Sequence, residues 1–402
     1  MELIEVCDLI IDCEHKTAPT QETGFPSIRT PNIGRGRFIL DGVNRVSEET
    51  YELWTHRAVP QPGDLIMARE APVGNVAMIP EGLRPCLGQR TLLIRPDRTK
   101  VEPSFLNYFL NGPHVQGLIH AKTNGATVAH LNMKDVRTMT LPELPPLPVQ
   151  RRIAGILSAY DELMENSQRR IRILEAMARA LYREWFVHFR FSGHEKLPRV
   201  ASPLGDIPQG WEGRFGDLAT IERDGINPFE FPDEEFEHFS IPAFDNGRQP
   251  AIELGATILS GKYYIDDSTV LLSKLNPRIP RVWLPVPSGQ RRAITSTEFL
   301  SLKPQPGVAR EFIYAKCCSE EFSGQFGSLA IGTSTSHQRV KPENLLAMPS
   351  PVPDRKTIAR FTKLVSPMLT VCQQLRLQIQ NLRRTRDLLL PRLVSGDCTL
   401  KL

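Results

Sequence analysis

The sequence lacks a long hydrophobic run, a signal-like N-terminus and a paired set of cysteines. Its apolar runs all stay below the roughly 18 residues that a transmembrane helix needs. Residues 1–5 do not form the basic and then apolar stretch of a secretory signal. The seven cysteines are odd in number and include no Cys-x-x-Cys pair. We therefore expect a cytoplasmic protein without a disulfide framework or a zinc knuckle.

The sequence also lacks a recognisable catalytic site. Residues 255–262 resemble a phosphate-binding loop, but five residues separate its glycines and Tyr263 replaces the hydroxyl residue that would hold Mg²⁺. Asn227-Pro228-Phe229 lacks the second proline of an amino-methyltransferase motif, and no glycine-rich loop follows a strand to bind S-adenosylmethionine. The nine histidines contain no His-x-x-x-His pair with an acidic companion. Two nuclease-like fragments lack a suitably placed acidic residue: Glu14-x-Lys16 and Glu195-Lys196.

Proline, in contrast, is abundant. The 34 prolines among 402 residues predict many turns and interrupted strands. The apolar fraction of 41% and the charged fraction of 23% are ordinary for globular proteins. This length suggests two or three domains.

The first 145 residues differ in hydrophobic period from those that follow. Short apolar runs such as residues 64–68 alternate with Pro or Gly turns, which predicts strands. A proline cluster at residues 142–148 then marks a domain boundary. Beyond it, alternating spacings of four and three, broken only by Ser167, predict one long helix over residues 146–192. Its seam consists of Ile153, Leu157, Tyr160, Met164, Ile171, Leu174, Ala178, Leu181 and Trp185.

The same order returns in the second half of the chain. After a linker over residues 193–210, strand-like runs resume, and a second proline cluster ends them at residues 349–353. A second heptad pattern predicts a helix over residues 352–396, which Pro367 should break or kink. Its seam consists of Ile358, Phe361, Val365, Met368, Cys372, Leu375, Ile379, Leu382 and Leu389.

Individual residues of the two halves also match, with an offset that drifts along the chain. Examples are Asp8-Leu9 with Asp217-Leu218, Pro72 with Pro277, Pro96 with Pro304, and Tyr108 with Tyr314. Five further matches share the offset 207: Gly125 with Gly332, His130 with His337, Lys134 with Lys341, Pro142 with Pro349, and Pro146 with Pro353. We infer an internal duplication. Pairing the two helices within one chain would bury both seams, although plain oligomerisation through them remains an alternative.

The net charge of +4 is too small to indicate a partner, but its distribution is uneven. Residues 355–392 carry nine basic residues and one acidic residue, which suits a polyphosphate or an acidic protein, or is simply a solvated helix face.

Two loops, residues 127–134 and 334–341, carry hydroxyl, imidazole, amide and ammonium groups that can contact bases or phosphates. Basic residues at turn-flanked strand ends could do the same, or could be ordinary surface charges. The candidate DNA-binding residues are Arg29, Arg69, Arg90, Thr127, His130, Asn132, Lys134, Lys274, Arg278, Arg281, Ser334, His337, Arg339 and Lys341.

The motifs at the helix ends resemble a known family. Residues 145–157 (PPLPVQRRIAGIL) are similar to the start of the first helix in specificity subunits of type I restriction-modification enzymes, and residues 176–187 (AMARALYREWFV) to its end. Residues 386–396 (RDLLLPRLVSG) are similar to the closing motif of the same family. The similarity covers the whole chain in order.

The resemblance implies an α+β fold. Two similar mixed α/β target-recognition domains, residues 1–145 and 203–350, would be separated by a pseudo-twofold pair of long, antiparallel, coiled-coil-like helices. It implies a non-catalytic subunit that recognises a bipartite site in double-stranded DNA. Two modification (methyltransferase) subunits would dock on it, and restriction (translocase) subunits would join through them. No cofactor or metal would bind this chain, and S-adenosylmethionine, ATP and Mg²⁺ would belong to the partner subunits.

Two other classes of protein remain open. A single-chain methyltransferase or nuclease with a fused recognition domain would need a catalytic region, for which two repeats leave no room. A purely structural heptad scaffold would not bind DNA.

Overall fold

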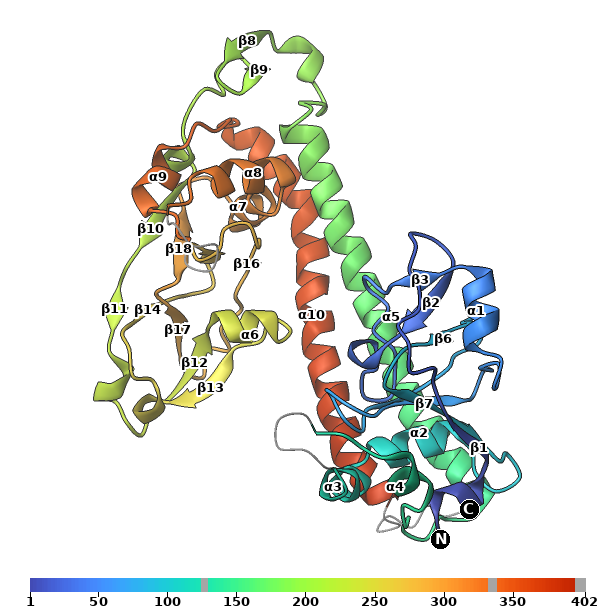
Figure 1. Cartoon of the computed structure of the whole chain (residues 1–402). Coiled ribbons are helices and arrows are strands. Elements are labelled where there is room, and N and C mark those ends of the chain that lie inside the picture. The colour runs from blue at the N-terminus through green and yellow to red at the C-terminus, as the bar shows by residue number, and fades with distance from the viewer. Residues whose placement is uncertain (124–128, 332–337, 395–402) are drawn as a thin grey trace. The chain divides into compact units, whose positions relative to one another are not determined.

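The computed structural model describes residues 1–123, 129–331 and 338–394 (Figure 1). By its internal contacts the chain divides into two compact units: unit 1 is Met1–Glu165 with Gln380–Leu402, and unit 2 is Asn166–Ile379. Each unit contains a globular part and a portion of two long helices, α5 (Leu147–Phe186) and α10 (Arg355–Val394). No helix in the described ranges has the length and apolar composition needed to cross a membrane.

Unit 1 is built on an antiparallel sheet with the strand order β1-β7-β4-β5. Strand β4 (Leu65–Ala68) is apolar at every position and is fully buried. Its side chains alternate between two cores, because successive strand residues point to opposite faces. Leu65 and Met67 pack with helices α2 and α3, and Ile66 and Ala68 pack with the smaller sheet β3-β2-β6. The elements are η1 (Leu3–Val6), β1 (Cys7–Asp12), β2 (Phe25–Ile28), η2 (Thr30–Asn32), β3 (Arg45–Val46), α1 (Glu48–Trp54), β5 (Val76–Met78), β6 (Cys86–Leu87), β7 (Thr91–Pro96), α2 (Pro103–Asn111), α3 (Pro113–Ala121) and α4 (Met133–Arg137).

Unit 2 has the same plan. Its main sheet has the order β10-β18-β15-β16, and its second sheet is β11-β14-β17-β12-β13. In both second sheets one strand has a parallel and an antiparallel neighbour: β2 pairs with β6 and β3, and β12 pairs with β17 and β13. This common topology confirms the predicted duplication and mixed α/β class.

The elements of unit 2 before the second long helix are η3 (His194–Lys196), β8 (Arg199–Ser202), β9 (Gly205–Pro208), η4 (Phe215–Asp217), β10 (Ala219–Glu222), β11 (Gly225–Ile226), η5 (Pro228–Glu230), β12 (Glu235–Phe239), α6 (Ile241–Asp245), β13 (Ala251–Leu254), η6 (Gly255–Thr257), β14 (Lys262–Tyr264), β15 (Val270–Ser273), β16 (Val282–Trp283), β17 (Arg292–Ser296), β18 (Phe299–Pro304), α7 (Arg310–Cys317), α8 (Glu320–Ser328) and α9 (Pro342–Ala347). The expected linker over residues 193–210 therefore contains a β-hairpin, β8–β9.

The residue matches between the two halves are wrong in part. Glu2 pairs with Thr140 in unit 1 and Arg214 pairs with Pro349 in unit 2, so Pro349 corresponds to Thr140 and not to Pro142. Three further matches are also wrong, because aligning the two units by their backbone hydrogen bonds and helix caps gives these residues other counterparts. They are Asp8-Leu9 with Asp217-Leu218, Tyr108 with Tyr314, and Lys134 with Lys341. Loops of unequal length change the offset, and a composition rich in proline produces chance matches at any one offset.

The match of Pro96 with Pro304 is confirmed, since Pro96 lies opposite Cys7 and Pro304 opposite Ala219. Gly125, Gly332 and His337 lie outside the described residues.

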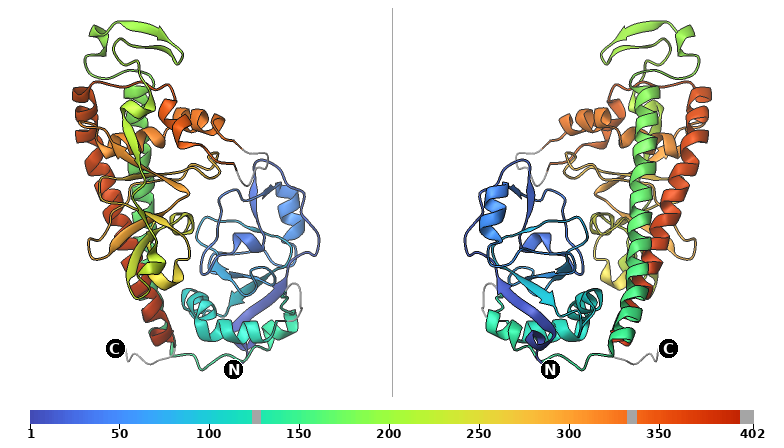
Figure 2. Two further views of the ribbon diagram at one scale, coloured as in Figure 1. Left: turned by 90° about the vertical axis from the view of Figure 1, so that its left-hand side faces the viewer. Right: turned by 90° about the vertical axis from the view of Figure 1, so that its right-hand side faces the viewer.

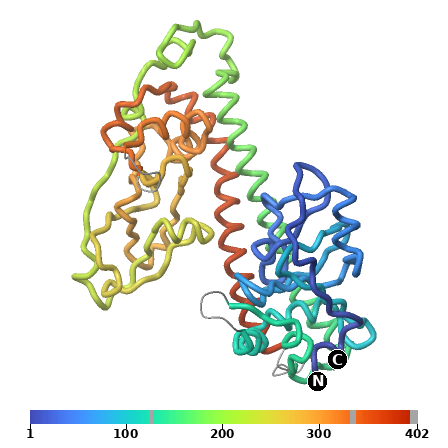
Figure 3. Tube along the Cα trace, viewed as in Figure 1, coloured from blue at the N-terminus to red at the C-terminus, as the bar shows by residue number. Residues whose placement is uncertain are grey.

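Helices α5 and α10 run antiparallel in each unit, where they lie side by side (Figures 1 and 2). In unit 2, Glu175 of α5 contacts Arg376 of α10, and Phe186, further along α5, packs on Phe361, which comes earlier in α10. In unit 1, Arg386 donates to Asp161. Unit 1 thus holds both the N-terminal strand and the described end of α10 (Figure 3).

The predicted seam positions differ in how far their side chains are buried. The fully buried ones are Ile153, Leu157, Met164, Ile171, Ala178, Ile358, Phe361, Val365, Cys372, Leu375 and Ile379. The half-buried ones are Tyr160, Leu174, Leu181, Trp185, Met368, Leu382 and Leu389. Ser167, the polar interruption, is also buried.

The expected break at Pro367 is wrong, because α10 is one helix of 40 residues, Arg355–Val394, that continues through this proline. Proline removes one helical hydrogen bond and crowds the carbonyl four residues before it. Pro367 is exposed, whereas Val365 and Leu369 on the other face are buried in the core of unit 2. Burial of these apolar side chains offsets the local loss. Asp354 also starts the helix, since its Oδ1 accepts the Thr357 N–H at 2.9 Å.

Replacing Pro367 with alanine should therefore stabilise unit 2 by about 1 kcal/mol or more, since alanine restores the N–H and has the best helix propensity. Thermal unfolding of the full chain measures this. Thr370→Ala, also exposed on α10, serves as the control and should change stability by less than about 0.5 kcal/mol. A less stable Pro367→Ala variant would contradict the prediction.

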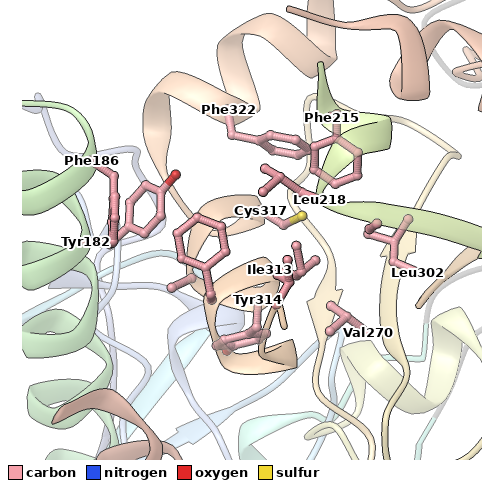
Figure 4. Close-up of a cluster of buried hydrophobic side chains, with 14 of the residues drawn as sticks. Tyr182, Phe186, Phe215, Leu218, Val270, Leu302, Ile313, Tyr314, Cys317 and Phe322 are labelled. Carbon is pink, nitrogen blue, oxygen red and sulfur yellow. The ribbon is translucent and has the colours of Figure 1, made fainter. Parts of the chain in front are cut away.

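Aromatic side chains join the end of α5 to the globular part of unit 2. Phe186 packs edge-on against Phe312 of α7 with ring centroids 5.0 Å apart, and Tyr182 lies 6.0 Å from the same ring. Figure 4 shows Tyr182 and Phe186 facing this core, which continues through Ile313, Tyr314 and Cys317 to the main sheet. Because these contacts span α5, α7 and α10, the helix pair is part of the hydrophobic core of unit 2.

One lysine is buried in this core. Lys316 of α7 is 6% exposed, and its Nζ lies 3.5 Å from the Tyr182 hydroxyl. Desolvation lowers the pKa of Lys316 from the ordinary 10.5 to about 8. Counted from the helix caps Glu102 and Ala309, the corresponding residue of unit 1 is Phe109, which is also buried. An apolar side chain therefore suits this position.

We expect Lys316→Met to stabilise unit 2 by roughly 1–2 kcal/mol at pH 7, because it removes a buried charge. Between pH 8 and 10.5 the unfolded chain retains the proton that the folded chain has lost, so wild-type stability should rise with pH there. The variant should lack this rise. Denaturant unfolding at pH 7 and pH 10 measures both effects, with the exposed Lys363→Met as control. A variant that keeps the rise would contradict the assignment to Lys316.

Candidate nucleic-acid interface

In unit 1, three segments carrying predicted site residues meet at one point. The backbone N–H of Arg69, just after β4, donates to the carbonyl of Arg90, just before β7, at 2.9 Å. The N–H of Leu131 donates to the Arg69 carbonyl at 3.0 Å. We call residues 69–70, 90 and 130–131 junction 1. The two hydrogen bonds fix the backbones of the three segments relative to one another, and so fix the Cα positions that carry these side chains.

Arg69 is the structural centre of junction 1. It is 7% exposed, and its Nε donates to the Leu131 carbonyl at 2.9 Å. Its Nη1 donates to Asp12 Oδ2 at 2.6 Å, and its Nη2 lies 3.0 Å from His130 Nε2. The Arg69 guanidinium therefore makes its hydrogen bonds to other groups of the protein. These bonds connect residues 130–131 to the sheet.

The hydrogen-bond partners of His130 fix its tautomer. A guanidinium can only donate, so His130 Nε2 must accept from Arg69. The hydrogen of the neutral imidazole then sits on Nδ1, which donates to Glu70 Oε1 at 2.9 Å. The other oxygen of Glu70 is 2.7 Å from Arg90 Nη1. A continuous chain of polar contacts thus runs from Asp12 to Arg90.

Arg90 is the most exposed cation of junction 1, with a side chain 63% accessible. Its backbone is left-handed, with φ of 64°, which is uncommon for a residue with a side chain. An exposed ion pair such as the one with Glu70 contributes little to stability, about 0–1 kcal/mol. Arg90 can therefore exchange Glu70 for another partner at small cost.

Unit 2 has the same backbone arrangement with different side chains. The Lys274 N–H donates to the Glu298 carbonyl at 3.0 Å, and the Val340 N–H donates to the Lys274 carbonyl at 3.1 Å. Arg339 Nε donates to Glu298 Oε2 at 3.0 Å. We call residues 274–275, 298 and 339–340 junction 2. Its only acidic side chain, Glu298, stands where unit 1 has Arg90.

The junctions contain five of the predicted residues: Arg69, Arg90, His130, Lys274 and Arg339. The others lie elsewhere. Arg281 is held by a bidentate contact with Asp245, at 2.8 and 2.9 Å. Asn132 and Lys341 stand at the N-caps of α4 and α9. Arg29, Lys134 and Arg278 are exposed, while Thr127, Ser334 and His337 lie outside the described residues.

Sequence reasoning missed the junction carboxylates Glu70 and Glu298, and also Asp12, which contacts Arg69, because the candidates were basic or neutral polar residues. The sequence signal that could have indicated Glu70 is its position directly after the candidate Arg69. Across the described ranges, no three His, Cys, Asp or Glu side chains gather as a metal site would require.

Part of the basic excess of α10 is used inside the units. Arg376 and Arg386 contact Glu175 and Asp161 of α5. Arg360 donates to the Ser192 carbonyl at 3.1 Å. Other basic residues of the helix are exposed: Arg355, Lys356, Lys363, Arg383, Arg384 and Arg392.

Comparison with known proteins shows which family part of the chain resembles. The model of the type I restriction modification DNA specificity domain matches residues 2–176, which include all of junction 1. The specificity subunit of the type I restriction enzyme MjaIX of Methanocaldococcus jannaschii is 23% identical over 376 residues, covering 90% of this chain and 83% of that protein. Residues 2–176 thus match this specificity domain, and most of the chain is similar to a type I specificity subunit.

Two further similarities extend the comparison. The putative MjaX specificity subunit of the same organism is 26% identical over 218 residues, covering 52% of this chain and 50% of that protein. The crystal structure of the type I restriction-modification S subunit from M. genitalium has a TM-score of 0.63 at 15% identity, covering 98% of this chain and 95% of that one. The structural likeness shows the fold.

Proposed function

We propose that this specificity subunit recognises an interrupted DNA site, with the globular part of each unit contacting one half. The observation that carries the proposal is the duplicated junction. The same backbone hydrogen bonds present different side chains in the two units: Arg69, Arg90 and His130 in one, and Lys274, Glu298 and Arg339 in the other. Two copies of one frame with different polar groups suit two different short sequences.

Helices α5 and α10 would set the distance between the half-sites, which on B-DNA are about 34–36 Å apart for one helical turn. Two modification subunits would dock on the chain and methylate adenine after turning the base out of the duplex. Restriction subunits would join through them. S-adenosylmethionine, ATP and Mg²⁺ would be bound by those partners, and this chain would bind none of them.

The adenine-methylation pattern of a genome that expresses this chain with its partner subunits tests the proposal. We expect one interrupted motif that disappears when the chain is deleted. Methylation or cleavage by the purified chain alone, supplied with S-adenosylmethionine or Mg²⁺, would instead support an enzyme with a fused recognition domain. Duplex binding should weaken steeply as salt rises, because phosphate contacts release counterions, whereas a mere scaffold would not bind.

Inserting seven residues into α5 and seven into α10 near the boundary between the units tests the spacing role. A heptad adds about 10 Å of helix, so the recognised spacer should grow by about three base pairs. The same insertion in α5 alone should abolish methylation, because the two seams then lose their register. Methylation sequencing measures both, and an unchanged spacer in the double insertion would reject the role of the helices.

A further inference from the structure

One position of the repeated fold carries opposite charges in the two units. Arg90 lies between β6 and β7, and its carbonyl accepts the Arg69 N–H. Glu298 lies between β17 and β18, and its carbonyl accepts the Lys274 N–H. Each residue directly precedes a strand that pairs with the first strand of its main sheet, β1 or β10. The two residues are structural equivalents, although no constant sequence offset relates the junctions.

Each of these charged groups contacts an oppositely charged side chain from a second segment of its own junction. Glu70 lies 2.7 Å from Arg90, and the Glu70 side chain is 15% exposed. Arg339 lies 3.0 Å from Glu298, and here the supporting side chain is the more exposed one, 47% against 27% for Glu298. The supporting residue is opposite in charge in both units, but it comes from different segments: Glu70 follows Arg69, whereas Arg339 precedes Val340. Such pairs orient a side chain while adding little to fold stability.

The two groups differ in which base edge they can recognise. A guanidinium donates two hydrogen bonds to O6 and N7 of guanine, and a carboxylate accepts from N4 of cytosine. A lone carboxylate would be repelled by DNA phosphates, but the Arg339 guanidinium beside Glu298 compensates this charge locally. Position 90 is thus suited to guanine and position 298 to cytosine.

We propose that Arg90 and Glu298 are equivalent specificity-determining residues, Arg90 for a guanine in one half-site and Glu298 for a cytosine in the other. Glu70 and Arg339 are positioning residues that orient them. This inference rests on the proposed function, because it assumes that each globular part contacts DNA. Beyond the proposed function, the inference names the side chains that distinguish the two half-sites.

The test uses the full chain assembled with its partner subunits, with genome-wide adenine methylation as readout. Arg90→Ala should reduce the preference for one base in one half-site by about tenfold or more, and Glu298→Ala should do the same in the other half-site. The other half of the motif should stay unchanged in each case. Arg90→Glu should shift the preference at its position from guanine toward cytosine, and Glu298→Arg should shift it in the opposite direction.

Two exposed, ion-paired residues outside the junctions serve as matched controls. Arg151→Ala and Glu222→Ala remove the same charges and should leave the motif unchanged. If a larger change prevents assembly, Arg90→Lys and Glu298→Gln can be used instead, because they keep a similar side-chain size. They should weaken the base preference at the same two positions of the motif.

Several results would overturn the inference: an unaltered motif in both alanine variants, relaxation of the same half-site by both, or relaxation by the controls. Failure of the proposed function would look different. In that case no methylated motif would depend on the wild-type chain at all.

Discussion

Replacing Phe361 with alanine is expected to destabilise unit 2 by about 3–5 kcal/mol, the loss measured for buried phenylalanines in other proteins. Phe361 of α10 is completely buried. Its ring centroid lies 5.0 Å from that of Phe186, 6.0 Å from that of Tyr182 and 6.2 Å from that of Phe312, each in an edge-on arrangement. The substitution removes one ring that contacts both α5 and α7, and leaves a cavity between them.

Denaturant unfolding of the full chain, combined with hydrogen exchange, would measure the effect of Phe361→Ala. Protection should fall in α5, α7 and α10 within unit 2, and β4 of unit 1 should keep its protection, since it belongs to a separate core. Phe229→Ala is the matched control because Phe229 is 54% exposed, and it should change stability by less than about 1 kcal/mol. Equal effects of the two substitutions would contradict the central place given to Phe361.

Replacing Arg69 with methionine should destabilise unit 1 by about 2–4 kcal/mol. Methionine retains most of the side-chain length but cannot donate hydrogen bonds. Asp12, the Leu131 carbonyl and His130 would each lose the partner that Arg69 provides. The loss follows from buried polar groups left without partners, and it should appear in unfolding curves and as faster exchange of the Leu131 amide.

Two variants make the Arg69 experiment decisive. Arg35→Met removes an exposed arginine of the same unit and should have an effect below about 0.5 kcal/mol. Asp12→Asn in the Arg69→Met background should recover part of the loss, because it removes the carboxylate that has lost its guanidinium. If Arg69→Met is as stable as Arg35→Met, the contacts assigned to Arg69 do not hold the junction together.

The long elements of the fold could be predicted from the sequence because their signals repeat many times. Helix α5 was expected over residues 146–192 and spans Leu147–Phe186, since nine apolar positions share one period. Strand β4 followed from an unbroken apolar run next to a turn. The duplicated order of strands, proline cluster and long helix was likewise visible without coordinates.

The features that failed depend on single residues in their tertiary surroundings. Whether Pro367 breaks α10 depends on the face of the helix that it occupies. The heptad pattern does not show how firmly Val365 and Leu369, on the opposite face, are buried. The predicted match of His130 with His337 is wrong: His130 corresponds to Arg339, because the N–H of the next residue, Leu131 or Val340, donates to the Arg69 or Lys274 carbonyl. Glu70 and Glu298 become site residues only through their contacts with Arg90 and Arg339, and an isolated carboxylate in a sequence carries no such information.

The uneven charge of the two long helices has a consequence for self-association. Helix α10 carries nine basic residues and a single acidic one, whereas α5 supplies the carboxylates Asp161 and Glu175 that α10 arginines contact. Two α10 helices from different copies would bring like charges together. Electrostatic repulsion thus disfavours the pairing of two α10 helices and favours the pairing of α10 with α5, which a single polypeptide provides.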